Sequence, residues 1–243
     1  MNFNRLSGTI VDDTPYIIGV AVSSVLITII LSLIGYFFLK SKKQKKLNKS
    51  KGLGAEEFVS NQAQFWSYKH NAMFIPPSMF KYNENKLFEV DGIIITQRAL
   101  VAIEVKHINA TSIVGKGNEK NWYKILGTEK HPIKSPILQN DRHLSHIVQM
   151  TKMKVPMVSL IIFDVNGTQK LEITDIPSHA IVITSDKIQE TLDAIQGFLI
   201  PKITSNEVQE LYFKLMDHKT NSREDKKLLI TYAKEFNEKT FTI

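Results

Sequence analysis

The chain has 243 residues, a formal net charge of +7 and no cysteine. A chain without cysteine has no disulfide, no thiolate metal site and no cysteine nucleophile. The length allows one sizeable domain, or one medium domain with appendages. Seven lysines lie between Lys40 and Lys51; once they and the three charged residues before them are set aside, residues 52–243 carry a net charge of only +1. The basic composition is therefore weak evidence for a nucleic-acid partner.

A long uncharged segment dominates the first fifty residues. Residues 14–39 contain no charged side chain, and residues 17–39 are long enough to span a bilayer, which needs roughly 20 apolar residues. A cleavable signal peptide is the rival interpretation. It is disfavoured because Asp12 and Asp13 precede the apolar run and the lysines follow it. We expect residues 1–15 to be a short extracytoplasmic N-terminus and residues 16–39 a transmembrane helix.

The lysine-rich segment, residues 40–53, is expected to be a juxtamembrane linker. By the positive-inside rule, the lysines place the large C-terminal part in the cytoplasm and the N-terminus outside, as in a single-pass protein of the cell membrane. The run from Lys40 to Lys51 is interpreted first as this topology signal and a solvated tether. Contact with anionic lipid headgroups, at about 1 kcal/mol per lysine, is compatible with that role. A contact with nucleic acid also stays open.

The rest of the chain reads as a mixed α/β domain. A helix is expected over residues 55–68, with an apolar stripe formed by Phe58, Gln62, Phe65 and Trp66. Pro132 and Pro136 are expected to bracket a loop. The other expected elements are strands at 87–95, 99–106, 112–115, 121–125, 155–163 and 180–184, and helices at 137–150, 186–198 (capped by Ser185), 205–216 (capped by Thr204 or Ser205) and from 222. A helix, three or four strands, a helix and a strand in this order are typical of that class.

The strands expected at 87–95 and 99–106 form the most informative stretch. Residues two apart on a strand share a face, so Glu104 and Lys106 point the same way. If the chain folds back at residues 97–98, Ile95 lies opposite Leu100 and Asp91 lies opposite Glu104. Like charges directly opposite one another destabilise a sheet, so a cation between the two carboxylates is expected. Mg²⁺ suits carboxylate and water ligands.

These residues resemble a known family. Asp91, followed by Glu104 and Lys106 in the spacing Glu-x-Lys, looks like the PD-(D/E)xK nuclease core. More narrowly, the chain is similar to the nuclease-related domain (NERD) family. Four segments carry the resemblance in the family's order: residues 54–59, 90–92, 103–107 and 135–139, with Trp122 between the last two.

The chain departs from the family pattern at two places. Ala55 separates Gly54 from Glu56, and Ser135 replaces the usual asparagine. Neither change removes an expected metal ligand. The resemblance covers residues 52–165 and does not explain the residues after 175.

The resemblance implies a restriction-endonuclease-like mixed sheet flanked by helices. We expect residues 54–175 to form this core, and residues 176–243 to add a strand and extra helices, packed on the core or separate from it. The implied activity is a metal-dependent phosphodiesterase that uses Mg²⁺, or Mn²⁺ in its place. Asp91 and Glu104 would be metal ligands, with the carbonyl of Val105 as a third.

The resemblance also gives roles to three further side chains. Lys106 would orient the attacking water and stabilise charge that builds on the phosphate. Glu56 would orient Lys106 or bind a second metal, and Gln139 would hold the water or a phosphate oxygen. In such phosphoryl chemistry, positioning and electrostatics carry the catalysis.

Each of these residues has a simpler interpretation. Asp91 could end a strand, and Glu104 with Lys106 could be a solvated ion pair worth about 0–1 kcal/mol. His143 and His146 lie three apart on an expected helix, but no third metal ligand accompanies them, so they are interpreted as ordinary polar helix residues or contacts to a nucleic-acid backbone. Trp122 is interpreted as core.

Three functions are consistent with this sequence. The first is a membrane-anchored, metal-dependent nuclease that acts at the cytoplasmic face on DNA, with RNA as the alternative substrate. The second is a catalytically silent module of the same fold that binds nucleic acid or a protein partner. The third is a membrane scaffold whose C-terminal helices bind other proteins. The set of Asp91, Glu104 and Lys106 favours the first, while the nearly neutral domain favours the second.

Overall fold

The computed structural model describes residues 14–83 and 86–240. The chain separates into two units, residues 1–50 and residues 51–243. Helix α1 (Thr14–Lys69) provides the described part of the first unit and continues into the second. Among the described residues, no helix is long and apolar enough to cross a membrane. The side chains of residues 16–29, most of the expected transmembrane helix, lie outside that part.

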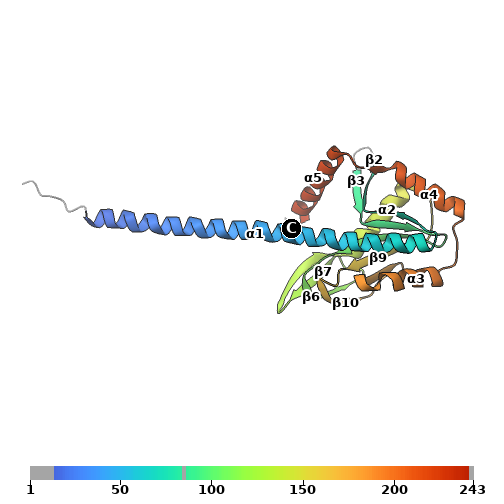
Figure 1. Cartoon of the computed structure of the whole chain (residues 1–243), viewed down its shortest axis with the longest axis horizontal. Helices are drawn as coiled ribbons and strands as arrows, with labels where there is room; N and C mark the ends of the chain where they lie inside the picture. The colour runs from blue at the N-terminus through green and yellow to red at the C-terminus, as the bar shows by residue number, and fades with distance from the viewer. Residues whose placement is uncertain (1–13, 84–85, 241–243) are drawn as a thin grey trace, which may run out of the picture. The chain divides into compact units, whose positions relative to one another are not determined.

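The second unit contains three sheets (Figure 1). The central sheet has the order β1-β4-β5-β9-β11, with strands β1 (Met73–Ile75), β4 (Gly92–Ile95), β5 (Leu100–Lys106), β9 (Met157–Phe163) and β11 (Ala180–Thr184). A second sheet has the order β10-β6-β7-β8, with strands β10 (Thr168–Thr174), β6 (Ala110–Lys116), β7 (Asn121–Leu126) and β8 (Glu129–Lys134). The small third sheet consists of β12 (Lys219–Thr220), β2 (Ser78–Asn83) and β3 (Lys86–Val90).

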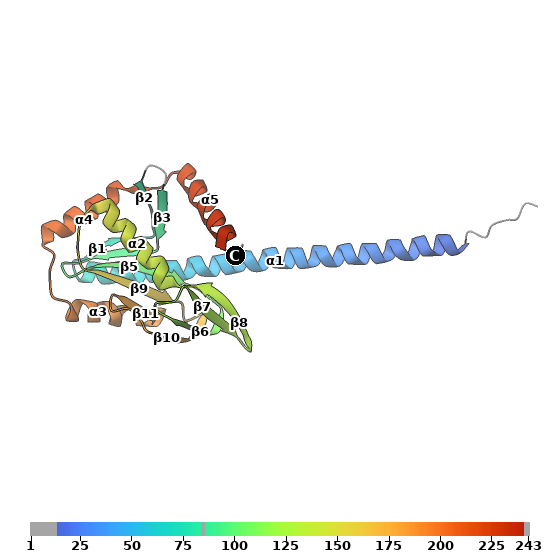
Figure 2. The same cartoon turned by 180° about the vertical axis from the view of Figure 1, so that it is seen from behind.

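Helices cover both faces of the central sheet. The segment of α1 from Ala55 onward and α3 (Ile188–Phe198) pack on one face. The other face packs against α2 (Pro136–Thr151) and α4 (Ser205–Asp217). Figure 2 shows β5, β9 and β11 side by side between α2 and α3. The described elements end with α5 (Arg223–Thr240). The domain is therefore the mixed α/β fold that the sequence predicts.

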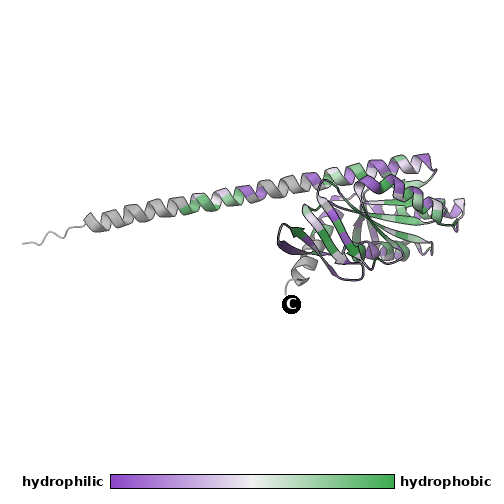
Figure 3. Ribbon diagram, turned by 90° about the horizontal axis from the view of Figure 1, so that it is seen from below, coloured by the Kyte–Doolittle hydropathy of each residue, from purple (hydrophilic) through white to green (hydrophobic). Residues whose placement is uncertain are grey.

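Strands β5, β9 and β11 run parallel to one another, with β11 at the edge of the central sheet. Every residue of β9 from Val158 to Phe163 is buried, as expected for a strand covered on both faces. Figure 3 shows strands inside the domain largely in the green of apolar residues, whereas the helices around them mix purple with green. Because the three strands are parallel, the loops that follow them meet at one edge of the sheet.

The register of the β4–β5 hairpin is the predicted one. Ile95 pairs with Leu100 and Gly92 pairs with Ile103, so Asp91, the next residue, comes level with Glu104. The segment before the turn differs from the expectation of one long strand. It is divided at Asp91 into β3 and β4, which belong to different sheets. Asp91 therefore sits at a break between strands.

The predicted apolar stripe on α1 is wrong except at Trp66. The buried side chains are Ala55, Val59, Ala63 and Trp66, whereas Phe58 is 48% and Phe65 is 62% exposed. The helix also does not begin at Ala55 but runs through Gly52 and Gly54. Glycine in a helix costs about 1 kcal/mol relative to alanine, which lowers helix stability without ending the helix.

Two further expectations need correction. Pro132 lies inside β8 and not in a loop, and β8 tolerates it because it is the edge strand of its sheet. Ser185 does not cap the following helix: it belongs to a short 3-10 helix, η1 (Ser185–Lys187), and its Oγ accepts a hydrogen bond from the Val165 N–H. The prediction for α4 is confirmed, since Thr204 and Glu207 form a capping box at its start.

Candidate functional site

The carboxyl end of β5 carries the acidic and basic pair that the sequence singles out. The Nζ of Lys106 lies 2.5 Å from Oε1 of Glu104. The Glu104 side chain is only 3% exposed, whereas that of Lys106 is 25% exposed. The pair is therefore not the solvated ion pair considered above. A buried carboxylate with a partly exposed ammonium beside it is costly to desolvate and depends on close partners.

Asp91 is held beside this pair by the backbone of β5. Its Oδ2 accepts a hydrogen bond of 2.7 Å from the Val105 N–H. Burial raises the pKa of Asp91 to about 8, and the negative charge of Glu104 adds to this rise. The opposing effects of the Val105 hydrogen bond and the Lys106 ammonium are smaller. The structure thus brings the two predicted carboxylates together, and the site lacks the positive charge that would keep both ionised.

Helix α2 brings Gln139 to the lysine. Ser135 caps this helix by accepting a hydrogen bond from the Leu138 N–H, and Pro136 occupies its first turn. Serine and asparagine are both good N-cap residues, which explains why Ser135 can replace the family's asparagine. Oε1 of Gln139, one turn into the helix, accepts a hydrogen bond of 3.0 Å from Nζ of Lys106.

Asn140 fixes the position of α2 on the sheet. Its side chain is fully buried, and Nδ2 donates to the Ala102 carbonyl at 2.9 Å and to Oγ of Ser159 at 3.1 Å. One bond reaches β5 and the other reaches β9. The residue was not singled out in the sequence, because a buried asparagine in a helix has no recognisable local signal.

His143 is the main site residue that the sequence analysis misjudged. It is not an ordinary polar helix residue: it is buried, and its Nε2 lies 3.4 Å from Oε2 of Glu104. Its ring stacks on that of Phe88, with centroids 5.7 Å apart. Burial raises the pKa of Glu104, but His143 and Lys106 together lower it more, so the pKa lies below the usual value. Glu104 is thus kept ionised beside a protonated Asp91.

Glu56 approaches the same cluster from α1. It is half-buried, whereas Glu57 next to it is exposed. Burial raises the pKa of Glu56, with further contributions from the charges of Glu89 and Glu104, while Lys106 opposes them. The structure thus places Glu56 within electrostatic reach of Glu104 and Lys106. No hydrogen bond joins Glu56 to either of them among the described residues.

The donor set fits a hard divalent cation. Among the described residues, no group of three or more acidic, histidine or cysteine side chains surrounds a single point. Two carboxylates are nevertheless side by side: burial is the main cause of the raised pKa of Asp91, and repulsion from Glu104 adds to it. A cation placed between them would remove that repulsion, and oxygen ligands are what Mg²⁺ and Mn²⁺ prefer. Asp91 and Glu104, with the Val105 carbonyl, are the residues that would hold it.

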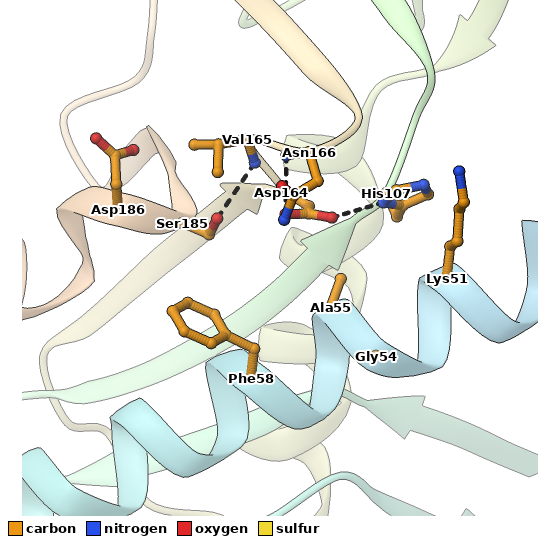
Figure 4. A pocket seen from close by; sticks show the side chains of 10 residues that line it. All are labelled: Lys51, Gly54, Ala55, Phe58, His107, Asp164, Val165, Asn166, Ser185 and Asp186. Carbon is orange, nitrogen blue, oxygen red and sulfur yellow. Dashed lines mark hydrogen bonds and ion pairs between the residues drawn. The ribbon is translucent and has the colours of Figure 1, made fainter.

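A neighbouring pocket lies at the same edge of the sheet, where β5, β9 and β11 end (Figure 4). His107 follows Lys106 but belongs to this pocket, and its Nδ1 lies 2.6 Å from Oδ2 of Asp164. Oδ1 of Asp164 accepts from the backbone and the side chain of Asn166, which closes the turn after β9. His107 and Lys106 therefore face opposite ways, the first toward Asp164 and the second toward Gln139.

Trp122 is core, as predicted. It is fully buried, and its Nε1–H donates to the Lys116 carbonyl at 2.8 Å. The backbone of Gly115 lies against the Trp122 ring, and a Cβ atom at residue 115 would come within 2.5 Å of the indole. Any side chain at residue 115 would therefore displace Trp122.

The fold and the site together define a nuclease-like α/β domain: an acidic pair, a lysine and a glutamine meet at one end of a mixed sheet. The comparison with protein families agrees with this class. Residues 51–164 match the model of the nuclease-related domain (NERD) family, so this part of the chain is similar to a nuclease-related domain. No curated protein and no solved structure matches the chain. The matched segment contains every candidate site residue from Glu56 to His143.

Proposed function

We propose that the chain is a metal-dependent nuclease that hydrolyses phosphodiester bonds, with DNA as its first expected substrate and RNA as the alternative. The observation that carries this proposal is the pairing of Asp91 with Glu104 beside the Lys106 ammonium. A family relationship to nucleases supports it independently. A purely structural ion pair would not need a second buried carboxylate that is protonated at neutral pH.

Asp91 and Glu104 would bind the metal, and a bound Mg²⁺ supplies Lewis acidity and lowers the pKa of a water molecule. Lys106 is already oriented by Glu104 and Gln139, so its third N–H can donate to a phosphate oxygen or to the attacking water. Gln139 accepts from Lys106 through Oε1, which leaves its amide nitrogen to donate to a phosphate oxygen. His143 acts as a positioning residue, because its partner is Glu104.

Cleavage assays on the full chain test this proposal. Labelled DNA and RNA oligonucleotides, single- and double-stranded, would be incubated with Mg²⁺, Mn²⁺ or EDTA. We expect cleavage with either metal and none in EDTA. The variants Asp91→Asn and Lys106→Met should each lower the rate by at least about 100-fold, the range found for groups that stabilise transition-state charge. Glu57→Gln is the matched control, because Glu57 is exposed and next to the candidate Glu56.

Two results would contradict the proposal. Cleavage that persists in EDTA or in the Asp91→Asn variant would exclude the metal mechanism. A folded chain that binds these oligonucleotides and cleaves none of them would favour the second candidate, a silent module that binds nucleic acid. The nearly neutral charge of residues 52–243 is the observation that keeps this candidate open.

We propose further that the domain is anchored to the cell membrane by residues 16–39, with the catalytic part in the cytoplasm. The support is the uncharged run of residues 14–39 and the lysine segment that follows it. In this arrangement the Lys40–Lys51 run tethers the domain and is close enough to the bilayer to contact anionic lipid. The nuclease would then act only on nucleic acid that comes to the membrane.

A further inference from the structure

The positive charge of the domain is unevenly distributed. Residues 110–134, which form β6, β7 and β8 and their turns, contain five lysines and two glutamates, a net charge of +3. Residues 52–243 as a whole carry only +1. The rest of the domain is therefore net negative, and the four-stranded sheet is its basic part.

Strand register places much of this charge on one face. Tyr123 pairs with Val114 of β6 and with Pro132 of β8, so these residues share a face with Lys116 and Lys130, two positions further along. The other face holds Ile113 and Trp122, which are fully buried in the core. The face with Tyr123 is therefore the outer face of the sheet. Its lysines are Lys116, Lys130, Lys134 and Lys170.

The outer face is hollowed next to its aromatic ring. A cavity of about 440 Å³ is lined by Lys116, Tyr123, Lys130 and Glu119, among others. The Nζ of Lys130 lies 3.9 Å from the centre of the Tyr123 ring. Glu172 pairs with Lys170 at 3.2 Å, so these two residues add no net charge. The positive charge of the outer face therefore comes from Lys116, Lys130 and Lys134.

The outer face of the four-stranded sheet adjoins the helix that carries part of the candidate active site. Strand β8 ends at Lys134, and α2, which carries Gln139, begins two residues later at Pro136. Arg142 is three residues after Gln139, so the two lie on adjacent positions of the same helical surface. Partial burial and then the charge of Arg142 lower the pKa of Lys134. Lys134 and Arg142 therefore lie within electrostatic reach of one another, where β8 ends and α2 begins.

We propose that the outer face of the β10-β6-β7-β8 sheet binds the sugar–phosphate backbone of a nucleic acid and leads it past Arg142 to Lys106. This inference rests on the proposed nuclease function and names the surface that holds its substrate. The argument for this occupant is charge complementarity. Lys116, Lys130 and Lys134 lie on the outer face. Arg142 lies near Lys134 on the helix that carries Gln139, in a site built for a phosphodiester. Phosphate contacts of this kind position a strand without reading its sequence.

Binding measurements on the full chain test the inference separately from catalysis. A labelled single-stranded oligodeoxynucleotide and its duplex would be titrated in EDTA, where the proposed enzyme does not cleave, at several salt concentrations. The double variant Lys116→Gln/Lys130→Gln should bind on the order of tenfold more weakly at low salt. Its slope of log affinity against log salt should fall by about 1.4 for the single strand, about 0.7 for each lost phosphate contact.

The matched control is Lys154→Gln/Lys202→Gln. Both lysines are exposed, and both lie at the opposite end of the central sheet: Lys154 precedes β9, and the Lys202 N–H bonds to Gln97 in the β4–β5 turn. The control should bind as the unmodified chain does. Equal losses in the two double variants, or no loss in the first, would overturn the inference.

Two parallel measurements separate it from the proposed function. If the unmodified chain cleaves nucleic acid and Lys116→Gln/Lys130→Gln binds and cleaves as well as it does, the inference about the outer face is wrong and the proposed nuclease function is supported. If the variant loses binding and the unmodified chain cleaves nothing, the face is supported and the nuclease fails. The last measurement uses vesicles that contain anionic lipid. If Lys116→Gln/Lys130→Gln loses binding to these vesicles but keeps its binding to the oligonucleotides, the inference is overturned in favour of a membrane-facing surface.

Discussion

At the scale of single residues, Asp91 decides how the site responds to pH. Its pKa is raised to about 8, so without metal the folded protein binds one more proton than the unfolded chain between about pH 4 and about pH 8. Stability should therefore be highest at the acidic end and fall as the pH rises through this window. Glu104 does not oppose the trend, because its lowered pKa affects stability only at more acidic pH.

This leads to a prediction for Asp91→Asn in the metal-free protein. The variant should lose the part of the decline between about pH 4 and about pH 8 that Asp91 causes, and should be the more stable protein at the upper end. The raised pKa of Glu56 leaves a decline in both proteins. The difference should be a few kcal/mol at most, because Asp91 keeps some solvent contact. Thermal unfolding followed by tryptophan fluorescence is a suitable measurement, since the chain has two tryptophans and both are buried. Mg²⁺ should restore stability at high pH in the unmodified chain and not in the variant.

Parallel curves of stability against pH for the unmodified chain and Asp91→Asn would contradict this prediction. If the unmodified chain and Asp91→Asn lose stability equally with pH, the raised pKa does not reside on Asp91. Glu57→Gln serves again as a control, because its exposed carboxylate should leave the pH dependence unchanged. A stabilisation by Mg²⁺ that survives in Asp91→Asn would place the ion elsewhere.

The residues of the site differ in how far sequence could predict them. Asp91 and Glu104 were predictable because a strand alternates with a period of two and the hairpin turn fixes the register. His143 was missed because its role depends on which face of α2 packs on the sheet. One signal was present: Gln139 and His143 are four residues apart, and such residues lie on the same side of a helix.

At the scale of elements, the attachment of α2 holds the site together. This helix carries Gln139 and His143, and Asn140 between them joins it to β5 and β9. Replacing Asn140 with alanine removes two buried hydrogen bonds, leaves the Ala102 carbonyl without this partner and opens a cavity. We expect Asn140→Ala to lower the free energy of unfolding by about 2–4 kcal/mol, measured by urea denaturation.

A control variant on α2 separates the loss of the Asn140 hydrogen bonds from the effect of alanine on helix propensity. Gln149 is exposed on α2, and Gln149→Ala should change the free energy of unfolding by less than about 0.5 kcal/mol. If Asn140→Ala were as stable as this control, the two hydrogen bonds would not hold α2 on the sheet. The cleavage rate should fall with Asn140→Ala even under conditions where the variant is fully folded, because the positions of Gln139 and His143 depend on the anchor.

Elements were predictable where their signals are local. The β4–β5 hairpin, the buried strand β9 and the capping box of α4 follow from alternation, an apolar run and Thr204 with Glu207. Strand β10 was missed because its parallel partner β6 lies far back in the sequence and its pattern alone is weak. The stripe on α1 was misjudged because small Ala55 and Ala63 pack closely on the sheet, leaving the larger Phe58 and Phe65 outside.

At the scale of the whole molecule, the charge of the chain has two separate centres. The lysine run before residue 52 accounts for the total of +7, and the basic face of the four-stranded sheet stands out within an almost neutral domain. The sequence could predict the first centre, because its seven lysines lie within residues 40–51. It could not predict the second, because strand pairing is what gathers those lysines on one face. The two centres suit two anionic surfaces, a bilayer and a nucleic acid.

The proposed membrane topology gives the last prediction. The chain has no cysteine, so single cysteines can be introduced and labelled without background. Ser7→Cys lies before the uncharged run, and Ser145→Cys lies on the exposed surface of α2. A maleimide that does not cross membranes should label Ser7→Cys in intact cells, whereas Ser145→Cys should react only after lysis, because the lysine segment keeps the domain inside. Labelling of Ser145→Cys in intact cells would reverse the orientation. Recovery of the chain in the supernatant after alkaline extraction of the membranes would exclude the anchor.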